Sequence, residues 1–438
     1  MGIEIIIGII AFLLGIAVGL PLCWVFLGSS IIILFFSNSS LLFAAGTCYY
    51  ALDSYVFMAI AFFILAGSLM SKAGISENII RFSYLLVGKI RGGMTAVAII
   101  ATLFLAALTG SALPCVASLI PILVEPLEKY GYEREYTTAV ICSSSFLGYL
   151  IPPSVPVLIY CLISSQSIAA VFLSTIVPGL LIAGGYIILN YFICGKYMHS
   201  FKENIPDLTK KENINIVWRA LPALSVPLFI LVSIYGGICT PNEAGSLAVM
   251  ITLFIGLCVY RKLNIKNILL STRDSLITLG MIGLLIPFGT LMARIFAREG
   301  AIHTVTTLIM SFSQSKVLIL LIINLLLLIL GMFMDGIPIL ILTVPLLISI
   351  AANININLVH LGALVVVNIG IGMISPPFAG SIFLGSRLSG VPYEKLLKPL
   401  LLFLFLVALP VLILTTYIPA LSCWLPTLIL GTKIVGAW

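Results

Sequence analysis

Apolar residues along this chain form long runs separated by short polar stretches, and most runs carry no charge. About 20 apolar residues suffice for a helix that crosses a bilayer, whereas about 12 do not. Several runs are of the shorter kind, and we interpret them as half-spans. The apolar segments cover residues 3–27, 29–50, 54–71, 93–109, 112–124, 137–151, 154–165, 168–194, 217–235, 243–260, 275–293, 301–313, 316–333, 337–350, 359–373, 378–389 and 396–430.

The short segments recur in two copies. Residues 147–153 (LGYLIPP) and 371–377 (IGMISPP) each end in a proline pair, and Pro376 follows Pro152 at an offset of 376 − 152 = 224. Other proline and glycine positions share this offset, including Pro114 with Pro338. We therefore predict a structural repeat with cores at residues 90–200 and 314–425, joined by connecting and scaffold helices at 201–313. Duplicated broken helices are the best sequence indication of a secondary transporter's binding site.

The proline pairs predict two re-entrant hairpins. Non-helical backbone at membrane depth must be buried in protein or line a watery cavity. We expect the tips near Pro152 and Pro376 to enter from opposite faces and to meet near the middle of the membrane. Interrupted helices free carbonyl groups that can bind a hard cation and amide groups that can face an anion.

The composition places nearly the whole chain in a membrane. Apolar residues make up 61% of the chain and charged residues 8%, against roughly 45–50% and 25% in soluble domains. We predict one all-α polytopic transmembrane domain over residues 1–438, with an inverted repeat of the kind found in elevator-type ion transporters. We expect no soluble ATPase domain within it. The first run, 3–27, is predicted to be a span and not a signal peptide, because it lacks a basic flank.

The net charge of +7 comes mainly from basic clusters, including those within residues 72–91 and 196–219. Basic loops favour the cytoplasmic side of a membrane. We therefore expect these clusters to lie beside the lipid bilayer, and we expect no nucleic-acid partner.

Two acidic residues have local explanations. Asp335 follows a long run of leucine and isoleucine and is either a functional carboxylate inside the membrane or the N-cap of the next half-helix. Glu243 follows Thr240 by three positions with Pro241 between them, which predicts a capping box.

A series of short motifs runs through about residues 90 to 380. They are Arg91-Gly92-Gly93, Thr109-Gly110-Ser111, Gly131-Tyr132, Leu147-Gly148, Ile151-Pro152-Pro153-Ser154, Val177-Pro178-Gly179-Leu180, Tyr235-Gly236-Gly237, Thr240-Pro241-Asn242-Glu243-Ala244, Gly331 with Met334-Asp335, and Gly372 with Ser375-Pro376-Pro377. In this order they make the chain resemble the large membrane subunit of tripartite ATP-independent periplasmic (TRAP) transporters.

The resemblance implies a sodium-driven importer in the bacterial inner membrane that works as an elevator and is not an enzyme. It implies a small TRAP membrane subunit and a periplasmic substrate-binding protein as partners, and an organic acid, a carboxylate, as substrate. The chain departs from the family at Ala112-Leu113-Pro114-Cys115, which replaces a run rich in serine and threonine. It also carries Ser375 where threonine is usual, and Phe378-Ala379-Gly380 in place of Val-Gly.

We expect Na+ at both breaks, because backbone carbonyls can bind a cation where a charged side chain is costly. One site is assigned to Gly331, Gly372, Ser375 and Phe378. The repeat offset transfers these to Ala107, Gly148, Ile151 and Ser154, with Thr109 and Ser111 adding hydroxyl groups. The substrate carboxylate is expected between the sites, at Ser111, Pro153, Asp335 and Pro377.

Two other classes remain open. A stand-alone cation-coupled carboxylate transporter or antiporter would also use broken helices, and an Asp or Lys pair deep in the spans would favour proton exchange. We expect no such pair from the sequence. A membrane-embedded enzyme is the third class, but the sequence has no HExxH motif and no Ser–His arrangement in helical register. Neighbouring reading frames for a four-span protein and a secreted binding protein would separate the first two classes.

Overall fold

The computed structural model describes residues 2–37, 40–198, 209–312, 315–377 and 379–438. This part of the chain is helical and contains no strand, although Tyr132 and Met198 form an isolated bridge. Nine of its helical segments are long and apolar enough to cross a membrane. The predicted all-α polytopic membrane fold is confirmed.

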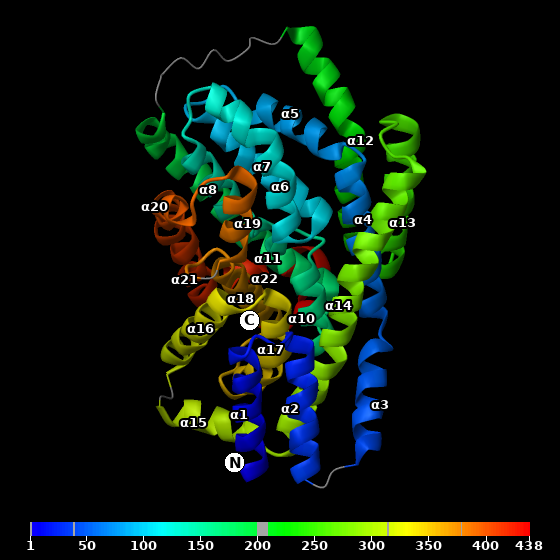
Figure 1. Ribbon diagram of the computed structural model, residues 1–438, viewed down its shortest axis with the longest axis vertical. Helices are drawn as coiled ribbons and strands as arrows, with labels where there is room; N and C mark the ends of the chain where they lie inside the picture. The colour runs from blue at the N-terminus through cyan, green and yellow to red at the C-terminus, as the bar shows by residue number, and fades with distance from the viewer. Residues whose placement is uncertain (1, 38–39, 199–208, 313–314, 378) are drawn as a thin grey trace.

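The helices form an N-terminal group, a scaffold, two repeats and a C-terminal pair (Figure 1). The N-terminal group is α1 (Ile3–Ala17), α2 (Leu22–Phe36) and α3 (Leu41–Leu52). The scaffold is α4 (Tyr55–Lys72), α12 (Lys210–Tyr235), α13 (Pro241–Phe254) with the π-turn η2 (Ile255–Val259), and α14 (Ile265–Arg298). The first repeat is α5 (Ile75–Val87), α6 (Gly93–Thr109), α7 (Ala112–Lys129), α8 (Arg134–Ser144), α9 (Leu147–Leu150), α10 (Val155–Ser164) and α11 (Ile168–Ile193) with η1 (Cys194–Tyr197). The second repeat is α15 (Ala301–Phe312), α16 (Lys316–Phe333), α17 (Gly336–Asn353), α18 (Leu358–Gly372), α19 (Gly380–Ser389), α20 (Tyr393–Phe403), η3 (Leu404–Ala408) and α21 (Leu409–Tyr417), and the C-terminal pair is α22 (Ala420–Leu430) and α23 (Thr432–Val435).

The two repeats share their helix boundaries. Helices α7 and α17 each contain 18 residues, and both ends of α17 follow those of α7 at the offset of the proline pairs. Helix α18 begins at Leu358, which follows the start of α8 at Arg134 by the same offset. In each copy a helix, a break and a second helix precede a hairpin that carries the proline pair, and both Pro–Pro bonds are cis.

The repeats pack against each other reciprocally. Helix α10, the second arm of the first hairpin, contacts α17, and α19, the second arm of the other hairpin, contacts α7. Figure 1 shows α7 in the upper half of the molecule and α17 in the lower half. The first hairpin, Arg134–Ser164, is mostly buried within the protein, whereas most residues of α14 are not buried. The reciprocal contacts and the opposite positions of α7 and α17 are those of an inverted repeat.

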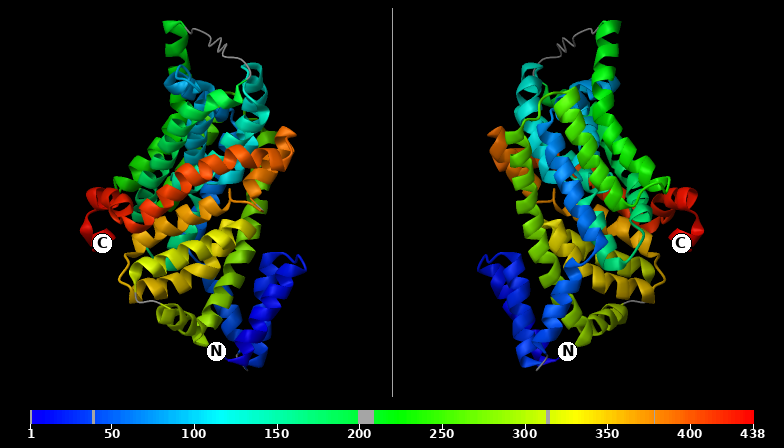
Figure 2. Two further views of the ribbon diagram at one scale, coloured as in Figure 1. Left: turned by 90° about the vertical axis from the view of Figure 1, so that its left-hand side faces the viewer. Right: turned by 90° about the vertical axis from the view of Figure 1, so that its right-hand side faces the viewer.

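The scaffold helices lie along one side of the repeats. Helix α4 packs on both α13 and α14, and α12 packs on α13. Figure 2 shows α1 and α2 near the end of the molecule that carries the N-terminus, where α2 contacts α14. Leu342 of α17 packs against the apolar cluster that α1 and α2 form with α14. Helices α4 and α14 also contact elements of the repeats, so they form the wall that faces them.

The N-terminal region corrects one prediction, the single span over residues 3–27. Helix α1 ends at Ala17, the chain turns through Gly19 with φ 81°, and α2 begins after Pro21. Glycine adopts positive φ without a steric penalty, and proline lacks the N–H needed to continue a helix.

The predicted capping box at the start of α13 is confirmed. The Thr240 hydroxyl accepts from the Glu243 amide, and the Glu243 carboxylate accepts from the Thr240 amide at 2.7 Å.

Candidate functional site

A cavity of about 750 Å³ lies between the scaffold and the two repeats. Its volume is typical of pockets that enclose small molecules. The scaffold wall contributes Ser68, Ser71 and Lys72 of α4 and Asp274, Ser275 and Thr278 of α14, and the repeat wall contributes Thr109, Ser111, Pro114, Ser118, Tyr149, Val155, Pro156, Asp335, Ile337 and Pro338. Both helix breaks therefore open onto one space.

The first break separates α6 from α7 at Gly110, whose φ of 61° favours glycine. Thr109 Oγ1 donates a 3.3 Å hydrogen bond to the carbonyl oxygen of Ser111. The Gly110 carbonyl accepts from the Val155 amide at 3.2 Å, just after the tip of the first hairpin. A methyl group at Gly110 would lie 2.5 Å from the carbonyl oxygen of Pro153. Break and hairpin are thus in direct backbone contact.

The rest of the first predicted sodium site lies beside this break. A methyl group at Gly148 would lie 2.5 Å from the carbonyl oxygen of Ser111. Ser154 caps α10, because its hydroxyl accepts from the Val157 amide, and it also donates to the Tyr149 carbonyl at 2.7 Å. Thr109 and Ser111 line the cavity, whereas the other predicted positions do not: Ala107, Gly148, Ile151 and Ser154.

The second break separates α16 from α17 at Met334 and Asp335. Beside it, Gly331 of α16 meets Gly372 of α18 so closely that a methyl group at Gly331 would lie 2.7 Å from the Gly372 Cα. Ser375 is buried and donates its hydroxyl to the Ile371 carbonyl at 2.8 Å. Gly331, Gly372 and Ser375 therefore lie at the junction of α16 and the second hairpin, and the fourth predicted position, Phe378, lies outside the described residues.

Two of the four predicted substrate positions line the cavity, Ser111 and Asp335. Pro153 is buried against the first break, and Pro377 is exposed with its carbonyl accepting from the Tyr393 hydroxyl at 2.8 Å. Neither proline lines the cavity.

Ser111 and Asp335 are the N-cap residues of α7 and α17, and neither side chain makes a capping hydrogen bond. First-turn amides of a helix have no partner within the helix and favour an anion. The Asp335 carboxylate instead accepts from the Tyr149 hydroxyl at 3.5 Å. Of the two interpretations of Asp335, the structure gives it the N-cap position without the capping bond, and it lines the cavity as well.

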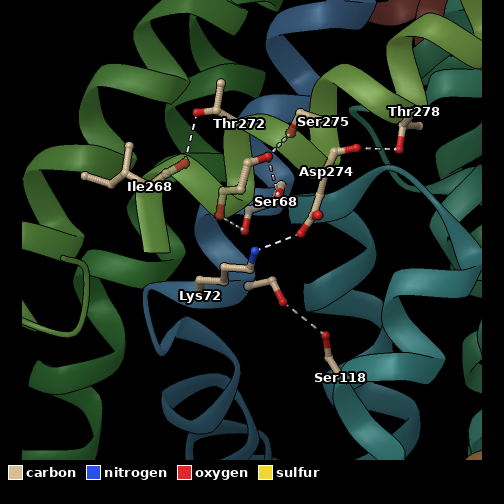
Figure 3. A network of polar contacts seen from close by, with 10 residues as sticks. Ser68, Lys72, Ser118, Ile268, Thr272, Asp274, Ser275 and Thr278 are labelled. Atoms are coloured by element: carbon tan, nitrogen blue, oxygen red, sulfur yellow. Dashed lines mark hydrogen bonds and ion pairs between the residues drawn. The ribbon is translucent and has the colours of Figure 1, made fainter. Parts of the chain in front are cut away.

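Polar side chains also line the scaffold wall (Figure 3). Lys72 Nζ, in the last turn of α4, lies 2.8 Å from Asp274 Oδ2 of α14. One turn earlier, Ser68 and Ser271 each donate a hydroxyl to the other's carbonyl at 3.3 Å. The neighbouring Ser71 hydroxyl lies 3.4 Å from that of Ser118 on α7 and so connects the scaffold with the first repeat.

The ion pair of Lys72 and Asp274 was not predicted from the sequence, and its side chains are partly exposed. Its residues are 202 positions apart in the sequence but meet between two span-length helices. Sequence reasoning assigns Lys72 to a basic cytoplasmic cluster and overlooks its partner. Asp274 offered a signal, because it is an acidic residue in the long apolar helix α14, and such residues are functional candidates.

The oxygen atoms available to a cation in this region come mostly from the backbone and from hydroxyl groups, with single carboxylates at Asp274 and Asp335. The described residues contain no group of three or more His, Cys, Asp or Glu side chains that could hold a metal ion. Hard cations prefer oxygen ligands. Oxygen atoms near the breaks include the hydroxyls of Thr109, Ser111 and Ser375.

Comparison with known proteins agrees with this architecture. The sequence profile described as "Tripartite ATP-independent periplasmic transporter, DctM component" matches residues 9–421. The chain is similar to the sialic acid TRAP transporter large permease protein SiaM of Vibrio cholerae, with 32% identity over 94% of this chain and 96% of that protein. It is also 32% identical to the C4-dicarboxylate TRAP transporter large permease protein DctM of Vibrio cholerae, over 93% of this chain and 94% of that protein.

A solved structure has the same fold. The YdaH transporter of Alcanivorax borkumensis superimposes with a TM-score of 0.66 over 87% of this chain and 88% of that one, at 13% sequence identity.

Proposed function

The chain belongs to the DctM component family of tripartite ATP-independent periplasmic transporters, as a large permease subunit, and we propose that it imports a small organic acid with Na+ across the bacterial inner membrane. In this proposal a periplasmic binding protein delivers the acid, a small membrane subunit completes the transporter, and no covalent chemistry takes place. The observation that carries the proposal is the cavity into which both uncapped half-helix N-termini open.

An acidic substrate suits the repeat wall of the cavity. The first-turn amides of α7 have no capping side chain. At the start of α17 the Asp335 carboxylate lies close to the amides of Gly336 and Ile337, although it makes no capping hydrogen bond. Two half-helix N-termini directed at one space favour an anion there. The similar proteins from Vibrio cholerae are described as transporters of sialic acid and of C4-dicarboxylates, which agrees with a carboxylate.

Sodium coupling rests on the oxygen groups at the two breaks. The first proposed site takes backbone oxygens from Ala107, Gly148, Ile151 and Ser154 with hydroxyl oxygens of Thr109 and Ser111. The second takes Gly331, Gly372, Ser375 and Phe378. Bound cations would lower the cost of placing a carboxylate beside Asp335, because they offset the negative charges that gather there. Uptake of the acid would in this way depend on Na+.

The transport step would be an elevator motion. The interior formed by the two hairpins and two broken helices would move as a unit along the wall of α4 and α14. The cavity supports this division, because residues of both the scaffold and the repeats line it. The hydroxyl contact between Ser71 and Ser118 is weak and exposed, so it could be broken and remade during the motion.

Reconstitution tests the proposal. The chain would be placed in proteoliposomes alone, with the small subunit, and with the small subunit and the binding protein, and uptake of radiolabelled succinate and sialic acid would be measured under a sodium gradient. We expect accumulation only with all three proteins and only with inward sodium. Uptake by the isolated chain would favour the stand-alone transporter, and sodium-independent uptake by the full set would refute the coupling.

A further inference from the structure

We propose that Lys72 on the scaffold wall binds the anionic group of the substrate. In this proposal Lys72 is paired with Asp274 only until a substrate carboxylate displaces the Asp274 carboxylate. The inference rests on the proposed function, since it assigns a further binding residue to the same cavity. It concerns the scaffold wall, whereas the half-helix N-termini and the proposed sodium sites belong to the repeats.

The charges around the cavity single out Lys72. Among the described residues that line the cavity, Lys72 is the one cation, and Asp274 and Asp335 are the two carboxylates. With all three ionised, the lining has a formal charge of −1, which opposes an incoming acid. Release of Asp274 from Lys72 would leave an ammonium group free for the substrate, and the flexible lysine stem allows that group to follow a ligand.

Because both side chains of the pair are partly exposed, the exchange costs little free energy. The Lys72 side chain is 29% exposed and the Asp274 side chain 57% exposed. A partly exposed ion pair contributes little to stability, and the exposed carboxylate can be hydrated when it leaves. Lys72 loses no charge partner in the exchange, because one carboxylate replaces another. Asp274 therefore acts as a competitor for the substrate's place.

The position of Lys72 gives the contact a mechanical consequence. The adjacent residue Ser71 meets Ser118 of α7, so Lys72 lies where the scaffold faces the repeats. An acid held by the starts of α7 and α17 and by Lys72 would bridge the two walls of the cavity. Movement of the repeats would carry the acid away from Lys72, and Asp274 would then rebind it. Lys72 would thus strengthen binding in one end state only.

Opposite effects of two substitutions test the exchange. We expect Lys72→Gln to raise the half-saturation constant for substrate about tenfold, as loss of a charge-assisted contact does. Asp274→Asn should lower the constant several-fold, because the competing carboxylate is gone, and Lys72→Arg should stay near the parent value. If the pair only clamps α4 to α14, Lys72→Gln and Asp274→Asn will instead impair uptake alike. Effects of the same sign, or no effect of either, overturn the proposal.

A matched control uses the ion pair between Lys262 and Glu77, which lies outside the cavity lining. Lys262 Nζ lies 2.7 Å from Glu77 Oε2, and the side chains of Lys262 and Glu77 are 47% and 54% exposed. Lys262→Gln should leave the half-saturation constant unchanged. A change as large as that of Lys72→Gln would mean that loss of any partly exposed ion pair has this effect, and would overturn the assignment to Lys72.

Direct binding separates this proposal from the transport proposal. Succinate and sialic acid would be titrated calorimetrically into the purified chain without partners, with Na+ present at a fixed concentration. Stronger binding of either acid by Asp274→Asn and weaker binding by Lys72→Gln supports the exchange, whether or not sodium drives uptake. If neither acid binds the parent chain or the Asp274→Asn variant, the proposed contact does not exist. Failure of uptake in the full reconstitution, with the binding differences intact, would count against the transport proposal alone.

Discussion

The contact between Gly331 and Gly372 should control both the packing of the second repeat and its affinity for sodium. An ideal Cβ at Gly331 would lie 2.7 Å from the Gly372 Cα, and one at Gly372 would lie 2.6 Å from the Gly331 Cα. Carbon atoms normally approach to about 3.5–4.0 Å. The obstacle is backbone and not a mobile side chain, so Gly331→Ala must push α16 and the second hairpin apart by roughly 1 Å.

The cost of this displacement can be bounded. One extra methyl group in a well-packed interior costs about 1–3 kcal/mol. The displaced carbonyls belong to the proposed sodium site, so a large part of this free-energy cost should appear as weaker sodium binding. Every 1.4 kcal/mol corresponds to a factor of ten, and we therefore expect the sodium half-saturation constant to rise about 5-fold to 100-fold.

The measurement is the sodium dependence of uptake in the reconstituted complex, together with the thermal unfolding of the purified chain. Gly184→Ala is the matched control, because it adds the same methyl group within helix α11 where nothing lies within 4 Å. It should be neutral or slightly stabilising, since alanine favours a helix over glycine. The cost of Gly331→Ala with Gly372→Ala should differ from the sum of the two single costs, because both methyl groups enter one contact. A Gly331→Ala variant with the parent's stability and sodium dependence would refute this reasoning.

Three further predictions concern the ions, the topology and a helix cap. Ser375→Ala and Ser111→Ala should each raise the sodium half-saturation constant about tenfold while binding of substrate to the soluble receptor stays the same, and unaltered sodium dependence in both would remove these hydroxyls from the sites. Gln166→Cys and Arg387→Cys, near the open ends of the two hairpins, should react with a membrane-impermeant thiol reagent from opposite sides of the membrane, and labelling of both from one side would contradict an inverted repeat. Thr240→Ala should lower the unfolding temperature through a loss of about 1 kcal/mol, because it removes the capping box of α13, and an unchanged melting curve would show that the cap contributes nothing.

Much of the fold follows from local features of the sequence. The apolar runs predict helices in a membrane, and the Pro and Gly positions predict where these helices break. Both ends of α17 agree with the offset read from the proline pairs. The Thr240 capping box could also be predicted, because it depends only on residues three positions apart. The prediction for residues 3–27 failed because the turn at Gly19 and Pro21 interrupts an otherwise continuous apolar run.

The candidate site could be predicted only in part. Thr109, Ser111 and Asp335 were found because they lie at breaks, and all three line the cavity. Pro153 and Pro377 were chosen for their place in the repeat, but that place says nothing about which way the backbone faces. Pro153 packs against Gly110, and Pro377 is exposed beside Tyr393.

The sequence by itself determined that this chain is a helical membrane protein with a duplicated pair of broken helices, because apolar run length, proline and glycine act on the neighbouring backbone. Only the tertiary structure decided which helices face one another. Lys72 and Asp274, 202 positions apart, become partners because α4 packs on α14. The backbone contact between Gly331 and Gly372 forms because α16 packs on α18. A sequence pattern shows which face of a helix is apolar, but the partner of that face depends on the shapes and charges of all the other helices at once.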